Sequence, residues 1–299
     1  MNTDKSTLYT MRWTATKIKA LTSDAKIDSL ADDLIEMTSG LLNEPIPDEA
    51  KPPEPPRPDQ NQKPVEGSPG GLKSLWYPKA NILKDVTKSA KGNYPKGYPE
   101  GLVVHFTAGQ YKHGQKDAID SIKSSPYFYL AMGTDGKVNQ ANPLNQWGYH
   151  CGDSAWIIDG KKVSGLSNRL VGLEICNPGR LELINGKYYT WFDKKNPIDA
   201  KDVRIIKKDD DNIQAGVYVP YSKEQEQGLI EFCLWLKLNN PEVFNFDLVL
   251  GHDEISGKKG IGYNRKNDPG GALSMNMTQF RELLKNEYVK LTKKGETNL

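Results

Sequence analysis

From about residue 72 onward, short apolar runs alternate with segments that have a helical pattern. The runs 101–109 (GLVVHFTAG) and 169–177 (RLVGLEICN) are typical of buried strands that end in polar residues or glycine. Between them, 127–140 (YFYLAMGTDGKVNQ) has two strand-like halves around a Thr-Asp-Gly turn, which is the pattern of a β-hairpin. These segments, together with FDLVLGH at 246–252, predict the strands of a central sheet.

Helical patterns lie between and after these runs. A short helix is expected within 113–125, and Ser222 with Gln225 forms a capping box that opens a second helix. This second helix is apolar on nearly all sides and stops before Pro241, so we expect it to be buried. A last amphipathic helix carries Met277, Phe280, Leu284, Tyr288 and Leu291. The mixture predicts an α/β fold with a central mixed β-sheet flanked by helices.

A proline-rich segment divides the chain. Nine of the nineteen prolines lie between Asn43 and Leu72, and proline cannot donate to helix or sheet hydrogen bonds. We therefore expect an N-terminal helical segment at 1–42, a semi-rigid linker at 43–71 and a main domain at 72–299. About forty residues make too small a core to stand alone. The segment 1–42 is thus expected to pack on the main domain, on a second copy of itself or on a protein partner.

Composition excludes several classes of function. The chain is 37% hydrophobic and 26% charged with a net charge of +2, and its lysines are scattered, so no nucleic acid partner is expected. No run approaches the ~18 apolar residues of a membrane span, so no membrane insertion is expected. The start, MNTDKSTLYTMRW, lacks the apolar core of a secretory signal, which predicts synthesis in the cytoplasm. The three cysteines have no metal-type spacing and are expected to be buried thiols.

Two of the four histidines end apolar runs, His105 in LVVH and His252 in LVLGH. If both strands belong to one sheet, both imidazoles emerge into loops near the same point. Asp268 lies sixteen residues after His252, on a loop stopped by Pro269. Two neutral imidazoles and a carboxylate are the ligands of a catalytic zinc ion, which keeps a fourth position for water. The same residues also suit hydrogen-bonded strand ends and a turn aspartate, so the spacing leaves both interpretations open.

Six segments occur together and in order. They are VVHFTAG, YFYLAMGTDGKVNQ, WGYHCGDSAW, NRLVGLEICNPG, PYSKEQ and GHDEI followed by RKNDPG. In this combination, residues 72–290 resemble the zinc-dependent N-acetylmuramoyl-L-alanine amidases of the amidase-2 type. That group shares its fold with peptidoglycan recognition proteins and phage lysozyme-type amidases.

The resemblance implies a site and a reaction. It makes His105, His252 and Asp268 the ligands of Zn2+, whose bound water becomes a nucleophile near neutral pH. Glu174 takes the place of the proposed general base, and Lys266 that of the cation which stabilises the reacting carbonyl. The bond cut would join the lactyl group of N-acetylmuramic acid to L-alanine in bacterial peptidoglycan.

Four further residues match family positions, and Trp156 is a further aromatic candidate for substrate binding. Arg265 matches a position that holds an acidic group of the stem peptide, and His150 one near the site that does not bind zinc. Tyr129 either lines the cleft or is a core aromatic, and Trp156 either stacks on a sugar or packs inside. Asn168 matches the asparagine that precedes the glutamate-bearing strand, a position that is more often structural.

Two segments depart from the family pattern. The loop between His252 and Asp268 carries the extra residues GKKGIGYN, and the glycines in it allow the loop to fold back. Residues 180–219 are an insertion relative to compact members, which extends the substrate groove or buries the N-terminal segment.

Three functions are compatible with the resemblance. The leading hypothesis is a phage or bacterial lytic amidase that acts on the cell wall. A non-catalytic peptidoglycan-binding module is a second, but the presence of Glu174, Lys266 and Asp268 argues against it. A cytosolic amidase that recycles muropeptides is a third. The absence of a signal sequence fits the third and fits equally a phage enzyme released by a membrane-permeabilising partner or carried by a virion.

Overall fold

The computed structural model describes residues 74–86, 90–257 and 266–294. The predicted N-terminal segment (1–42), the predicted linker (43–71), Arg265 and most of the extra loop GKKGIGYN lie outside the described residues.

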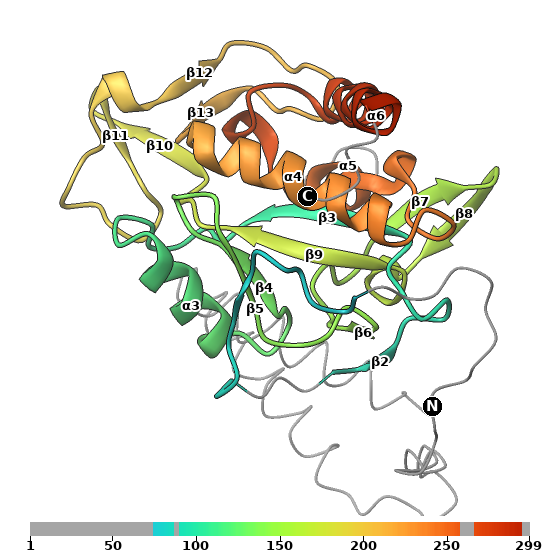
Figure 1. The fold of residues 1–299 in the computed structure, drawn as a ribbon. Helices are drawn as coiled ribbons and strands as arrows, with labels where there is room; N and C mark the ends of the chain where they lie inside the picture. Colours follow the sequence, from blue (N-terminus) through green and yellow to red (C-terminus); the bar gives the residue numbers. More distant parts are fainter. Residues whose placement is uncertain (1–73, 87–89, 258–265, 295–299) are drawn as a thin grey trace, which may run out of the picture. The chain divides into compact units, whose positions relative to one another are not determined.

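A six-stranded sheet forms the centre of the fold (Figure 1). Its strands, in spatial order, are β1 (Asn81–Ile82), β5 (Val138–Gln140), β4 (Leu130–Met132), β9 (Leu170–Ile175), β3 (Gly101–Phe106) and β14 (Val249–Gly251). The pair β4–β5 is antiparallel, as the predicted hairpin requires, and the other neighbours are parallel. The predicted central mixed sheet is therefore confirmed.

Two long helices, α4 (Lys223–Asn239) and α6 (Met277–Lys294), pack against each other along the β3–β14 side of the sheet (Figure 1). The predicted capping box is present, because Ser222 Oγ accepts from the Gln225 amide at 3.0 Å and Gln225 Oε1 from the Ser222 amide. Two other helices contact the sheet, α3 (Gln115–Ser124) and α5 (His252–Ser256). Within the described part of the chain, no helix is long and apolar enough to cross a membrane.

Successive side chains of the central strands point to opposite sides of the sheet. Leu102 and Val104 of β3 belong to the main core with residues of α4 and α6, whereas Val103 joins a smaller cluster with Ile255 of α5. His105 is two residues after Val103 and lies on the same side of the sheet, so it faces away from α4 and α6. The three cysteines are free and buried, as predicted.

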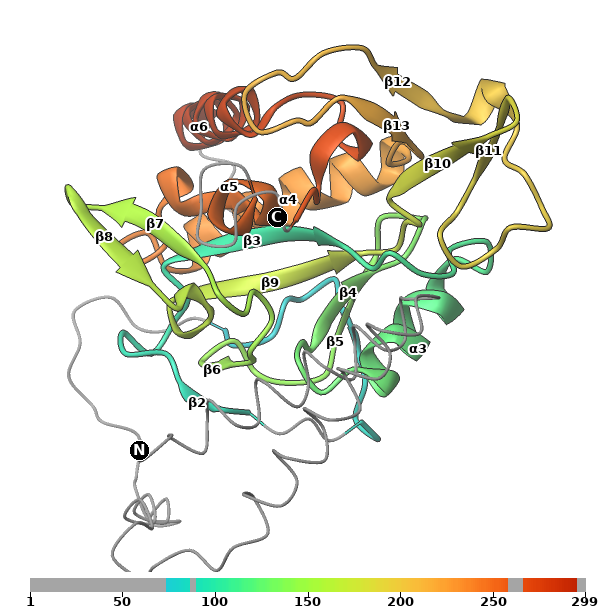
Figure 2. The same cartoon turned by 180° about the vertical axis from the view of Figure 1, so that it is seen from behind.

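Residues 180–219 form a second sheet. Its order is β11 (Lys187–Tyr189), β10 (Arg180–Ile184), β13 (Gly216–Tyr218) and β12 (Arg204–Ile206), and all pairs are antiparallel. These strands have three to five residues and few buried positions, so they lack the apolar alternation that identifies strands. Figure 2 shows this sheet at one end of β3 and β9, and the hairpin of β7 (Ala155–Ile158) and β8 (Lys161–Ser164) at the other. A further strand pair joins β2 (Gly92–Asn93) to β6 (Gln146–Trp147).

His252 begins α5, although the sequence placed it where a strand emerges into a loop. Glu254 fixes this short helix because its carboxylate accepts from the Gly251 amide at 2.9 Å and from both terminal nitrogens of Arg281 at 2.8 and 3.0 Å. All five residues of this helix are buried and only Ile255 is apolar, so it has no apolar stripe and therefore no amphipathic signal in the sequence.

A buried ion pair joins the starts of β3 and β9. Glu100, which is 6% exposed, accepts from Arg169 at 2.6 and 2.7 Å and from Lys96 at 2.7 Å. Burial alone would raise the pKa of Glu100, but the hydrogen bonds from Arg169 and Lys96 outweigh it and hold the pKa below its usual value.

We expect Glu100→Gln to lower the free energy of unfolding by about 2 kcal/mol at pH 7, since it leaves Arg169 without its charged partner. The folded-state pKa is lowered, so this stabilisation is present above the ordinary glutamate pKa of ~4.3 and is lost as the pH falls through the folded-state pKa. Urea unfolding of both proteins from pH 7 down to pH 3 measures the difference. An equal difference across that range would show that the charge of Glu100 is not what stabilises the fold.

Candidate active site

Three buried side chains converge where the central parallel strands end. His105 is the fifth residue of β3, His252 follows β14, and the register pairs Gly251 with Val104, so the two histidines lie at the ends of adjacent strands. Their Nδ1 atoms are 2.9 Å apart, and each lies 3.0 Å from Oδ2 of Asp268. The sequence prediction that these three residues meet is therefore correct.

A chain of hydrogen bonds fixes the tautomer of His105. His150 Nε2 lies 2.9 Å from the Leu170 carbonyl oxygen, which can only accept, so the neutral His150 ring carries its proton on Nε2. His150 Nδ1 is then an acceptor, and it lies 3.0 Å from His105 Nε2, which must donate. Burial lowers the pKa of His150 well below its usual value and that of His105 to about 4, so both rings are neutral. The Nδ1 atom of His105 is left with a free electron pair.

A hydrogen bond to a backbone carbonyl also determines the tautomer of His252. Its Nε2 lies 3.2 Å from the Cys151 carbonyl oxygen and donates to it, which leaves Nδ1 unprotonated in the neutral ring. Burial alone would raise the pKa of Asp268, but the neighbouring His252 and His105 outweigh burial and hold it below its usual value. The Asp268 carboxylate is thus ionised.

In the neutral tautomers that these Nε2 contacts favour, the cluster presents three electron-pair donors to one point. Donors this close repel one another unless a cation lies among them, and two imidazoles with one carboxylate are a metal-binding set. Across the described ranges, this is the one group of at least three His, Cys, Asp or Glu side chains that converges in this way. The residues present fit a bound metal ion.

Glu174 and Lys266 border the same pocket. The register of β3 and β9 pairs Glu174 directly with His105, so their side chains lie next to each other on one side of the sheet. Burial raises the pKa of Glu174 well above its usual value, the Asp268 charge adds to this, and the Lys266 ammonium opposes it. The pocket has a volume of about 330 Å3. Its lining comprises His105, Phe106, Thr107, Ala108, Phe128, His150, Glu174, His252, Lys266, Asn267 and Asp268.

Comparison with known sequences identifies the family of this site. The family described as N-acetylmuramoyl-L-alanine amidase matches residues 95–271, a range that contains every clustered side chain named above. The chain belongs to the amidase-2 family. The enzyme class predicted from the sequence, an N-acetylmuramoyl-L-alanine amidase, is thereby confirmed.

Several solved structures are similar to this amidase. A selenomethionine derivative of AmpD is 17% identical over 71% of this chain and 98% of its own, with a TM-score of 0.40. The endolysin amidase LysCS from Clostridium intestinale URNW is 14% identical, covers 71% of this chain and 98% of its own, and has a TM-score of 0.39. The AmpD of Citrobacter freundii is 17% identical over 71% and 94% of the two chains, with a TM-score of 0.38. No curated protein matches this sequence.

The insertion supports the amidase loop that carries Asp268. Arg204 of β12 donates from Nη1 to the carbonyl oxygens of Gly271, Ala272 and Leu273 at 3.0, 3.2 and 2.6 Å. Gln214 donates to the Lys266 carbonyl at 3.2 Å. The insertion therefore helps to position Asp268 and Lys266.

Sequence reasoning missed two residues that position His105. Tyr221 donates its hydroxyl to the His105 carbonyl at 3.1 Å. A Cβ atom at Gly172 would meet the His150 ring at 2.5 Å, so glycine leaves room for that ring against β9. The only sequence signal for the second contact is a glycine inside an apolar strand, which often marks a close approach.

Three predicted substrate residues do not line the pocket. Tyr129 is buried in the main core and donates its hydroxyl to the Gln146 carbonyl at 2.7 Å. Trp156 is partly buried against the cluster around Val103, and Asn168 is exposed in a short 3-10 helix, Leu166–Asn168. Their roles in substrate binding stay predictions.

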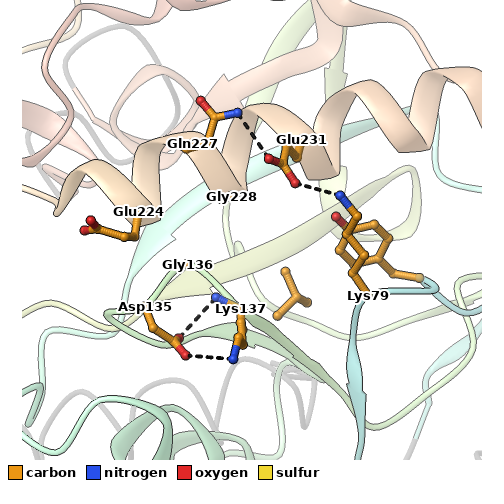
Figure 3. Close-up of a pocket in the computed structure, with 10 residues that line it drawn as sticks. Lys79, Asp135, Gly136, Lys137, Glu224, Gln227, Gly228 and Glu231 are labelled. Carbon is orange, nitrogen blue, oxygen red and sulfur yellow. Dashed lines mark hydrogen bonds and ion pairs between the residues drawn. The ribbon is translucent and has the colours of Figure 1, made fainter. Parts of the chain in front are cut away.

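A second hollow lies between α4 and the β4–β5 turn (Figure 3). Figure 3 shows Lys79 directed at Glu231, 3.0 Å away, and Lys137 beside Asp135 at 3.8 Å. Its two lysines are thus neutralised by neighbouring carboxylates, and it contains no histidine or cysteine. We assign no part of the amidase chemistry to it.

Proposed function

We propose that this amidase cleaves the bond between the lactyl group of N-acetylmuramic acid and L-alanine in bacterial peptidoglycan, with a zinc ion bound by His105, His252 and Asp268. The observation that carries the proposal is the convergence of three potential ligand atoms within 2.9–3.0 Å of one another. Zinc accepts this ligand set and is the catalytic metal that commonly uses three protein ligands. When bound there, zinc would lower the pKa of a water molecule, so that the water can lose a proton and attack an amide near neutral pH.

The side chains of this amidase complete the reaction. Glu174 accepts a proton from the attacking water and passes it to the departing nitrogen of L-alanine as the C–N bond breaks. Lys266 places positive charge near the carbonyl oxygen, where negative charge develops in the tetrahedral transition state. Arg265, outside the described residues, would bind a carboxylate of the stem peptide through its guanidinium group.

We infer that the substrate is the wall polymer, as for a phage or bacterial lytic enzyme. Two exposed aromatic residues immediately precede pocket-lining residues in the chain, Tyr127 before Phe128 and Tyr149 before His150. Exposed aromatic rings beside a pocket suit a long chain that extends beyond it, whereas a small muropeptide needs no such surface. The recycling of free muropeptides is the alternative use of the same site.

The hydrogen-bond chain through His150 predicts a specific effect on metal affinity. We expect His150→Ala to weaken zinc binding about 10- to 100-fold, because His105 then loses the acceptor that fixes its tautomer. Gly172→Ala should act in the same direction by displacing the His150 ring. Competition with a chromogenic chelator measures the dissociation constant. Unchanged zinc affinity in both variants would remove His150 from the support of the site.

Cell-wall pelleting combined with product analysis tests the proposed function. The proposal expects the protein to release soluble stem peptides with a free L-alanine amino terminus and no new reducing sugar ends. Sedimentation with the walls without any release would instead identify a binding module. Release of new reducing ends would indicate cleavage of the glycan and contradict the proposal.

A further inference from the structure

Trp191 is a large aromatic side chain that the insertion holds at the surface. It follows β11 and is 60% exposed, although its indole Nε1 donates a hydrogen bond of 2.6 Å to the Ala108 carbonyl. The polar end of the ring is therefore satisfied while much of its apolar surface faces solvent. Such an arrangement is costly for an isolated surface residue and is typical of binding surfaces.

The hydrogen bond places Trp191 at the edge of the active site. Ala108 lies three residues after His105 and lines the same pocket as the three proposed ligands. Its backbone has φ of 50°, a conformation that is uncommon for residues other than glycine. The indole thus lies on the segment that leaves the metal cluster.

The turn that carries Trp191 is ordered by its own contacts. Asp193 accepts hydrogen bonds from the amides of Lys195 and Asn196 at 2.9 and 3.1 Å, and its own amide donates to Thr190 Oγ1 at 3.0 Å. The ring of Phe192 meets that of Trp191 edge to face, with 5.6 Å between their centroids. The indole is thereby held in place before any substrate arrives, which lowers the entropy cost of binding to it.

We propose that Trp191 is a stacking platform for a pyranose ring of the glycan, which makes it a residue that determines specificity for substrates that carry a sugar. The inference rests on the proposed function, since a sugar carries the lactyl group on the carbonyl side of the scissile bond. A pyranose has a face of C–H groups that matches an exposed aromatic ring. The stem peptide is a poorer match, because it is a flexible chain with polar amides and has no such face.

Kinetics on two substrates test the platform in the zinc-loaded, full-length protein. One substrate is a disaccharide–peptide, and the other has the same scissile amide and peptide on a lactyl group without a sugar. We expect Trp191→Ala to lower kcat/KM for the disaccharide–peptide about 5- to 20-fold and to leave the sugar-free substrate within about two-fold. Trp191→Phe should retain most of the activity, because it keeps a stacking face and loses only the hydrogen bond to Ala108.

A matched control is Leu183→Ala, which removes another exposed apolar side chain, 61% exposed, from the same inserted sheet. It should change neither kinetic constant. Equal losses on both substrates, or a loss in Trp191→Phe as large as in Trp191→Ala, would assign Trp191 to holding the Ala108 segment and overturn the proposal. An unmodified protein that cleaves neither substrate would instead refute the proposed function.

Calorimetry with the free disaccharide distinguishes failure of the stacking proposal from failure of the proposed function, because this product binds without being cleaved. The platform predicts weaker binding of the disaccharide in Trp191→Ala and unchanged binding in Leu183→Ala. Equal disaccharide affinity in the Trp191→Ala variant and the unmodified protein would overturn the platform whatever the amidase activity is.

Discussion

Replacement of His105, His252 or Asp268 by alanine, one at a time, should abolish amide hydrolysis. Each change removes one of three donor atoms that lie within 3.0 Å of one another, so the remaining two no longer hold the metal ion in an active geometry. We expect kcat/KM to fall by on the order of 10³-fold or more in each variant, together with the loss of stoichiometric zinc. Peptide release from purified peptidoglycan and elemental analysis of the same samples measure both quantities.

The natural control for this series is His113→Ala. His113 is an exposed histidine outside the cluster, and it pairs with Asp117 at 3.2 Å. Its replacement should leave zinc content unchanged. Any cluster variant that is folded by circular dichroism, lacks zinc and retains full activity would show that the metal is not part of the reaction.

Glu174→Gln should lower kcat by about 10²- to 10⁴-fold without removing the zinc, because the amide cannot accept a proton from the attacking water. Glutamine has nearly the shape of glutamate and avoids a buried cavity beside His105. The expected signature is therefore an inactive protein with normal metal content, which differs from the cluster variants. Steady-state kinetics and elemental analysis of the same preparation measure it.

Lys266→Ala provides the comparison for the Glu174 variant. We expect a loss of about 10²- to 10³-fold in kcat, since charge stabilisation in the transition state is removed while proton transfer is retained. A Glu174→Gln protein with near-normal kcat would rule out this residue as the proton acceptor and would leave its strand position beside His105 without a catalytic purpose.

Sequence patterns were sufficient for the central sheet and for the pairing of the site residues. The strands β3 and β9 are continuous apolar runs because both sides of the sheet are covered, and each run ends at a polar residue. The positions of His105 and His252 could be predicted from these runs, because the ends of neighbouring parallel strands lie together. Asp268 could be named from its loop as a possible third ligand, but only the family resemblance favoured this interpretation over a turn aspartate, because a loop residue has no periodic signal.

The contacts that orient the site could not be predicted from sequence. The tautomer of His105 depends on the hydrogen bond between His150 and the Leu170 carbonyl, which lies twenty residues further along the chain. The support of the Asp268 loop by Arg204 joins residues 67 to 69 positions apart, from a sheet whose strands are too short and exposed to be recognised. Both are long-range contacts of polar groups, and hydrophobic periodicity carries no information on them.

The insertion contacts two parts of the active site. Through Arg204 and Gln214 it holds the loop that carries Asp268 and Lys266, and through Trp191 it contacts the segment that follows His105. Of the two roles that the sequence suggested for residues 180–219, the contact of Trp191 with Ala108 favours an extension of the substrate groove.

Mass spectrometry of peptidoglycan digested by the full-length protein, before and after treatment with a zinc chelator, tests the central claim most directly. The account predicts stem peptides with a free L-alanine amino terminus and intact glycan strands before treatment, no release after chelation, and recovery when zinc is restored. Undiminished release of the same peptides by protein shown to be free of metal would contradict it.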